Sequence, residues 1–250
     1  MPQDSGIPSR LSARSAAGWS LRLFPEAGEA VAIFQSAGRP GRLGSGGDPD
    51  ESARVATRRA RTRVRRYCAA NGLNRLATLT YASPFCTDPQ VLREHVGVFF
   101  RSLRRELGGD AFPYLWTGEL HKDGIRWHAH FAVGRYVSRS KIERSWPYGF
   151  VHIKLLGDLP YGSLALDQAR LAARYLSKYV GKSFAGQGYG LHRYEVAQQF
   201  APRHEGTRAP TSDAVVAWAV ERMGRFPDFV QWSTEWYDYQ GPSAVFLSWT

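Results

Sequence analysis

Two histidines separated by one residue are the first feature of this chain that could do chemistry. The segment 127 to 133 reads Trp-His-Ala-His-Phe-Ala-Val, and the apolar residues around His128 and His130 are typical of a strand. Because side chains on a strand alternate between its two faces, both imidazoles point to the same face. Two adjacent imidazoles are half of a site for a divalent metal ion.

An Asp-Gly pair lies just before this strand. Asp123-Gly124 is the strongest short signal for a two-residue type I′ turn between paired strands. A hairpin built on that turn has a fixed register, in which Glu119 faces His128. Alternation then places Glu119 on the same face as His128 and His130.

One carboxylate and two imidazoles suit Mn²⁺ or Mg²⁺ with open positions for water or phosphate, although imidazole also accepts Zn²⁺ or Ni²⁺. The sequence lacks the His-Glu-x-x-His of zinc proteases and the Pro-Cys-x-x-Cys of deaminases. His121 lies on the same face nearer the turn, where it could support the ligands from outside. Ordinary strand histidines are the alternative interpretation of such a pair taken alone.

A second pattern lies in a predicted helix that begins near Asp167. Tyr175, Lys178, Tyr179 and Lys182 are spaced three and four residues apart, so they share one helical face. An ammonium group beside a phenol stabilises both the phenolate and an adjacent phosphate. Solvated lysines beside packed tyrosines are the alternative for this pattern alone, and a metal site nearby favours the chemical interpretation.

Three motifs in one order resemble a known family. A Thr-Leu-Thr strand at 78 to 80, the His-x-His strand and a Tyr-x-x-Lys-Tyr-x-x-Lys helix follow one another between Arg54 and Lys182. This order resembles the HUH endonucleases, specifically rolling-circle replication initiators with two tyrosines. Conjugative relaxases of the same superfamily carry the tyrosine before the histidines, whereas here it follows them, as in initiators and related transposases.

The resemblance implies a metal-assisted transesterification on single-stranded DNA at a replication origin. The reaction leaves a 5′-phosphotyrosine and a free 3′-OH that can prime synthesis. Glu119, His128 and His130 are the implied ligands, and Mn²⁺ or Mg²⁺ is the implied cofactor.

The same resemblance assigns roles on the tyrosine helix. Tyr179 matches the single nucleophile of some plasmid initiators, in which the position of Tyr175 is a glutamate. We therefore expect Tyr179 to attack first and Tyr175 to terminate or pass on the strand, with Lys178 and Lys182 easing the charge. A transposase is the alternative enzyme, and a DNA- or RNA-binding protein without catalysis is the alternative outside the enzymes.

The charge of the chain fits a polyanionic partner. The 250 residues include 33 Lys and Arg against 22 Asp and Glu, a formal net charge of +11. A predicted helix over 54 to 66 carries arginines on too many sides to have a buried face, and a solvated surface is the alternative to a contact with the DNA backbone. The arginines expected to bind DNA are Arg58, Arg59, Arg61, Arg63, Arg65 and Arg66.

The domain organisation follows from composition and periodicity. Residues 1 to 52, rich in Gly, Ser, Pro and Ala, are predicted to be a flexible lead with at most one strand at 30 to 35. Residues 53 to 250 are expected to form the endonuclease domain with a C-terminal extension. Its predicted class is α+β, a central antiparallel sheet with flanking helices.

The elements that must position the site are also predicted. A capping box at Thr87-Asp88-Pro89-Gln90 opens a helix with the apolar stripe Leu92, Val96, Phe99, Leu103 and Leu107. A helix capped at 211 to 213 runs through Met223, and 186 to 208 is expected to be a loop. Strands are expected at 76 to 81, 113 to 120, 126 to 134 and 150 to 156, and late strands within 229 to 239 and 244 to 249.

The remaining motifs bear on location and partners. Cys68 and Cys86 form no metal pattern, no apolar run reaches membrane length, and the N-terminus has no signal-peptide core. We expect a cytoplasmic bacterial protein, encoded by a plasmid or mobile element, without a membrane partner. Gly181-Lys182-Ser183 lacks the earlier glycine of a phosphate-binding loop, so the helicase and polymerase are expected from the host or from another gene.

Overall fold

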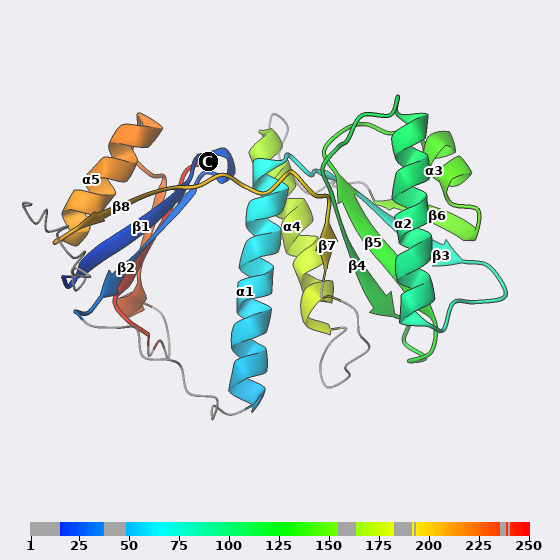
Figure 1. Cartoon of the computed structure of the whole chain (residues 1–250), viewed down its shortest axis with the longest axis horizontal. Coiled ribbons are helices and arrows are strands. Elements are labelled where there is room, and N and C mark those ends of the chain that lie inside the picture. Colours follow the sequence, from blue (N-terminus) through cyan, green and yellow to red (C-terminus); the bar gives the residue numbers. More distant parts are fainter. Residues whose placement is uncertain are drawn as a thin grey trace, which may run out of the picture. The chain divides into compact units, whose positions relative to one another are not determined.

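The computed structural model describes residues 16–37, 49–154, 164–182, 192, 194–235, 239 and 241–250; of residues 49, 181 and 182 it describes the backbone only. The chain divides into two compact units. One draws on residues 1–23, 30–46 and 205–247, and the other on 24–29, 47–204 and 248–250. Each unit is built on an antiparallel five-stranded sheet, which confirms the α+β class (Figure 1).

The sheet of the second unit carries the predicted chemistry. Its central strands β3, β5 and β4 pair antiparallel, and β6 and β7 form its edges. All four predicted strands are confirmed as far as the chain is described, although residues 155 and 156 lie outside the described part. In spatial order the strands are β6 (Gly149–Lys154), β3 (Arg75–Tyr81), β5 (Trp127–Val133), β4 (Tyr114–Leu120) and β7 (Glu195–Val196).

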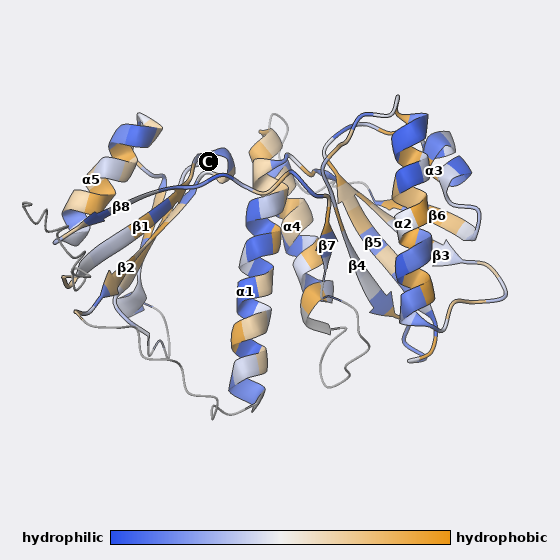
Figure 2. Cartoon of the chain, in the orientation of Figure 1, coloured by the Kyte–Doolittle hydropathy of each residue, from blue (hydrophilic) through white to orange (hydrophobic). Residues whose placement is uncertain are grey.

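One face of this sheet is covered by α2 (Pro89–Glu106) and α3 (Arg139–Ser145). Helix α2 begins within the predicted capping segment, but Asp88 rather than Thr87 is the cap: its carboxylate accepts a hydrogen bond of 2.7 Å from the amide of Gln90. The predicted apolar stripe of α2 faces the sheet, where four of its five residues are buried and Leu107 is partly buried. Figure 2 shows this stripe as orange bands between blue, polar ones.

The opposite face of the sheet is covered by α1 (Pro49–Ala70) and α4 (Ala165–Lys182), which pack side by side (Figure 1). Leu176 and Val180 of α4 are fully buried against a small apolar cluster that includes Leu76 of β3 and Ala132 of β5. Because side chains alternate along each strand, Thr78 of β3 faces α4 as Leu76 does. Helix α4 therefore lies over the face to which the two histidines point.

The first unit contains two strands from the segment that was predicted to be a flexible lead. Leu21 and Leu23 alternate toward a core and are 1% and 0% exposed, and a single strand was expected here. The Gly- and Ser-rich residues around them obscured this short alternating run. The unit's elements are β1 (Gly18–Phe24), β2 (Glu29–Gln35), β8 (Glu205–Ala209), α5 (Ser212–Met223), β9 (Phe229–Trp232), η2 (Ser233–Glu235) and β10 (Ala244–Ser248). The short helix η1 (Pro25–Ala27), between β1 and β2 in the sequence, belongs to the second unit.

Elements near the C-terminus largely follow the prediction. Thr211 caps α5 by accepting a 3.3 Å hydrogen bond from the amide of Ala214, and strands lie in both late segments. The interpretation of 186–208 as a loop is wrong at two short strands of its described part, because β7 extends the site's sheet and β8 pairs with β1, whereas residues 197–204 between them contain no helix or strand. Among the helices that the structure describes, none has the length and apolarity needed to cross a membrane.

Candidate active site

The register of the β4–β5 hairpin is the one predicted. Glu119 pairs with His128 and Leu120 with Trp127, and Thr117 pairs with His130. Paired residues on neighbouring strands project to the same face. The carboxylate and both imidazoles therefore converge, as the alternation of side chains required.

The turn that sets this register is not the predicted type I′ turn. Gly124 has φ +71°, but Asp123 does not adopt the positive φ that a type I′ turn needs at both central residues. Instead the amide of Gly124 donates to the carbonyl of His121 at 2.9 Å. The Asp123 carboxylate accepts from the amides of Ile125 and Arg126 at 3.0 and 3.1 Å, which favours this wider turn.

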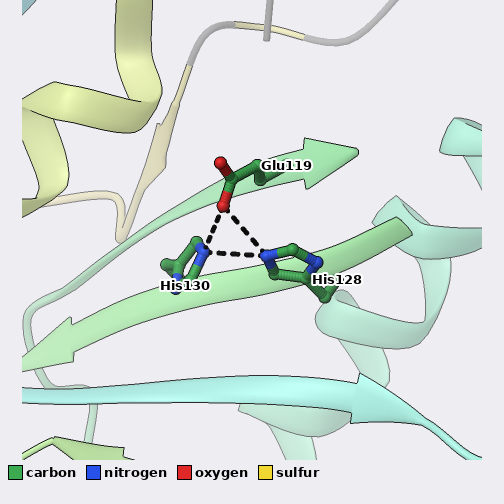
Figure 3. A group of neighbouring side chains, drawn as sticks. All are labelled: Glu119, His128 and His130. Carbon is green, nitrogen blue, oxygen red and sulfur yellow. Dashed lines mark hydrogen bonds and ion pairs between the residues drawn. The ribbon is translucent and has the colours of Figure 1, made fainter. Parts of the chain in front are cut away.

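Three side chains meet at one point on the sheet (Figure 3). Glu119 Oε2 lies 3.0 Å from His128 Nε2 and 2.8 Å from His130 Nε2, and the two nitrogens are 2.9 Å apart. The two histidines are only 9% and 6% exposed. In the part of the chain that the structure describes, this is the one group of His, Cys, Asp and Glu side chains found close enough together to share a metal ion. We call Glu119, His128 and His130 the metal group.

The spacing of the three atoms is compatible with one shared metal ion. Two ligands that are each about 2.1 Å from an ion lie about 3.0 to 3.4 Å apart in octahedral or tetrahedral sites. The observed separations of 2.8–3.0 Å are close to this range. Glu119, His128 and His130 therefore lie close enough together to hold one ion.

The protonation states of these groups suit metal binding. Burial by itself would raise the pKa of Glu119, but hydrogen bonds from His128 and His130 lower it to about 2. Burial lowers the pKa of His130, which keeps that imidazole neutral. A charged carboxylate and a neutral imidazole are the forms that bind a metal ion.

Thr78 supports the metal group from the neighbouring strand, a role that the sequence analysis missed. Its hydroxyl lies 2.9 Å from His130 Nδ1. When His130 uses Nε2 as a ligand, Nδ1 carries the proton and donates it to Thr78, which fixes the ring. His121, proposed for such a role, packs its ring edge-on against His128 with the centroids 5.1 Å apart.

Replacement of Thr78 by valine is expected to weaken Mn²⁺ binding by roughly 10- to 100-fold, because the valine cannot orient the His130 ring. Isothermal titration of the protein with Mn²⁺ measures this change. Thr80→Val, one step along the same face of β3, is the matched control and should leave the affinity within about twofold. Equal affinities for both variants would contradict the role of Thr78.

The tyrosines of α4 lie against the metal group. The rings of Tyr179 and His130 are stacked, with centroids 3.9 Å apart and planes inclined by 15°. The Tyr175 ring is farther from His130, at 6.3 Å, and the Tyr179 hydroxyl donates to the Tyr175 oxygen at 2.7 Å. Tyr179 therefore lies directly against His130, and Tyr175 lies farther from His130 and contacts Tyr179.

Burial and its hydrogen bond with Tyr175 favour the neutral phenol form of Tyr179. Burial, the hydrogen bond with Tyr175 and the negative charge of Glu119 all raise the pKa of Tyr179. Lys178 is exposed, with its ammonium 5.9 Å from the centroid of the Tyr175 ring. Lys154 of β6, which the sequence analysis did not select, lies closer to that centroid at 4.4 Å. The side chain of Lys182 lies outside the described part.

The arginines predicted to bind DNA lie on α1, where several have protein partners. The prediction that this helix has no buried face is wrong, because Val64 and Cys68 are fully buried. Arg65 and Arg66 pair with the buried carboxylate of Glu29, at 2.6 and 3.2 Å, and Arg61 donates to the carbonyl of Ser177. Arg63 forms a hydrogen bond with Tyr194. Arg58 and Arg59 are exposed near the N-terminal half of the helix.

The ion pairs of Glu29 with Arg65 and Arg66 are expected to stabilise the fold. Glu29→Ala is expected to lower the free energy of unfolding by about 2 to 3 kcal/mol, because it leaves Arg66 without its buried partner, while the partial exposure of Arg65 limits the loss. Urea unfolding measures the change. Glu51→Ala removes an exposed pair with Arg54 and should cost at most about 0.5 kcal/mol. A similar small loss for Glu29→Ala would show that the pairs contribute little.

One segment of the chain that contains this site matches a known family. An antiparallel sheet presents two histidines and a carboxylate, and a helix later in the chain lays two tyrosines against them. Residues 74–184 match the family model described as replication-associated protein ORF2/G2P. This segment, less than half of the chain, is similar to replication-associated (Rep) proteins, and it contains Glu119, His128, His130 and both tyrosines. Searches of curated proteins and of solved structures found no significant match.

Proposed function

We propose that this protein is a rolling-circle replication initiator that nicks and rejoins single-stranded origin DNA. The observation that carries the proposal is the stacking of Tyr179 on His130 of the metal group. This stacking would place Tyr179, the proposed nucleophile, next to residues that suit a divalent ion. Both lie within a segment that matches a replication-associated family. A protein that only bound DNA would need neither the buried ligand set nor the paired tyrosines.

The protein residues have separable tasks in this reaction. Glu119, His128 and His130 would hold Mn²⁺ or Mg²⁺, and that ion would polarise the scissile phosphate. The Tyr179 oxygen attacks phosphorus and gives up its phenolic proton, while the bond from phosphorus to the 3′ oxygen breaks. The 3′ oxygen leaves, takes up a proton and becomes a free 3′-OH, and the 5′ phosphate stays on tyrosine.

The second tyrosine would serve the joining step. Tyr175 and Tyr179 lie one helical turn apart and share a hydrogen bond, so a small movement of the DNA could bring either phenol to the same phosphate. The ammonium groups of Lys154 and Lys178 lie near Tyr175, where they would offset charge on the bound phosphate. Strand synthesis from the free 3′-OH would require a polymerase and a helicase. We assign both to the host or to a separate gene.

A labelled-strand assay tests this function. The protein is incubated with Mn²⁺ and single strands tiled across its own replicon, each labelled at the 3′ end, and then resolved on a denaturing gel. A labelled band at the mass of protein plus DNA is expected, together with a 5′ fragment that a polymerase can extend. Cleavage without a covalent band would contradict the mechanism, and chelation of Mn²⁺ should abolish both products.

A further inference from the structure

The register of the sheet aligns an exposed aromatic side chain with the metal group. Phe150 of β6 pairs with Thr80 of β3, Thr80 pairs with His128, and His128 pairs with Glu119. Paired residues share a face, so these four side chains form one row across the sheet. Phe150 ends this row on the edge strand and is 69% exposed.

The same face of β6 continues with polar and cationic groups. His152 ends the row that contains Thr78 and His130, and Lys154 ends the next row, beside Leu76. His152 and Lys154 are both exposed. We call Phe150, His152 and Lys154 the β6 strip.

The β6 strip lies close to the reacting groups. Neighbouring strands are about 4.8 Å apart, so Phe150 is displaced about 10 Å from His128 along the row. At the other end, the Lys154 ammonium is 4.4 Å from the centroid of the Tyr175 ring. The strip therefore runs beside both the metal ligands and the tyrosine pair, within reach of the nucleotides next to a bound phosphate.

Phe150 also borders a hollow lined by aromatic rings. The hollow has a volume of about 600 Å³ and includes Phe85, His95 and Tyr148. Phe85 is 47% exposed, and the rings of His95 and Tyr148 stack at 3.7 Å. The cation of the strip, Lys154, lies four residues farther along β6 and does not line this hollow. Exposed aromatic rings for the bases and a cation for the backbone are the combination by which proteins hold single-stranded nucleic acid.

We propose that the β6 strip binds the DNA strand beside the scissile phosphate, with Phe150 stacking on a base and Lys154 contacting a backbone phosphate. This inference rests on the proposed function and specifies how the same site holds its substrate. The positive charge of Lys154 complements the phosphates, and an exposed phenyl ring accepts any base, so the strip holds the strand without reading its sequence.

Fluorescence anisotropy tests the strip with the full-length protein, without metal, and a fluorescein-labelled dT12 strand. Phe150→Ala is expected to weaken binding by roughly 5- to 150-fold, the effect of losing one stacked base. Phe150→Trp should restore the affinity. Phe226→Ala removes an 80% exposed ring from the other unit and is the matched control, expected to leave binding unchanged. Thermal unfolding should be the same for both alanine variants.

Lys154→Gln supplies a second readout, because the loss of one phosphate contact should reduce the slope of log Kd against log salt by about 0.7. Equal affinities of Phe150→Ala and Phe226→Ala for dT12 would contradict the proposed role of the β6 strip. An unchanged affinity and salt slope in Lys154→Gln would contradict it as well. Failure of the proposed function is distinguishable: the wild-type protein would then form no covalent adduct with Mn²⁺ even if Phe150→Ala weakens dT12 binding.

Discussion

Replacement of Tyr179 by phenylalanine should lower the rate of the first covalent adduct by at least about 10³-fold, since the variant lacks the attacking oxygen. The ring remains, so its stacking on His130 and the packing of α4 should persist. The measurement is the time course of the protein–DNA band formed with Mn²⁺ and a cleavable 3′-labelled strand. Thermal unfolding of the variant should match that of the wild-type protein within a few degrees.

Tyr175→Phe is the matched control on the same helix. It should still nick, and it should fail to complete strand transfer to a second strand. The double Phe variant should do neither. An undiminished adduct in the double variant would defeat the tyrosine mechanism, whereas exchanged phenotypes of the single variants would only exchange the roles of the two residues.

The combined change of His128→Ala with His130→Ala should reduce cleavage by at least about 10³-fold, because one carboxylate cannot hold the ion that polarises the phosphate. Binding of single-stranded DNA should change only a few-fold, because binding depends mainly on contacts to the phosphate backbone. Cleavage and anisotropy assays on the same preparations separate the two effects. His121→Ala, which removes an imidazole that packs against His128 from outside the ligand group, should retain most of the cleavage activity. Equal loss of binding and cleavage in a folded double variant would make the histidines DNA anchors rather than metal ligands.

The central part of this site was predictable because local patterns determine it. Alternation on β4 and β5 set the faces of Glu119, His128 and His130, and an Asp-Gly pair placed the hairpin even though its turn has another geometry. Spacing along α4 placed both tyrosines on one face. In each case the decisive interactions lie within a few residues of one another in the sequence.

Features that depend on distant parts of the chain were not predictable in this way. The pairing of Arg65 with Glu29 joins residues far apart in sequence, and the arginine alone looked like a DNA contact. Thr78 and Phe150 acquire their places only when β3 lies between β5 and β6. The alternation of Phe150, His152 and Lys154 against Val151 and Ile153 was visible in the sequence, but not which strand it would adjoin.

Peptide mapping of the covalent adduct tests the central claim most directly. Trypsin cuts after Arg174, Lys178 and Lys182, so Tyr175 and Tyr179 fall on separate four-residue peptides, 175–178 and 179–182. After the DNA is digested to a single nucleotide, mass spectrometry identifies the peptide that carries it. The first adduct should carry its nucleotide on 179–182, and a nucleotide on 175–178 should appear only once a second strand has been supplied. A nucleotide on neither peptide, in a protein that still cleaves, would contradict the account.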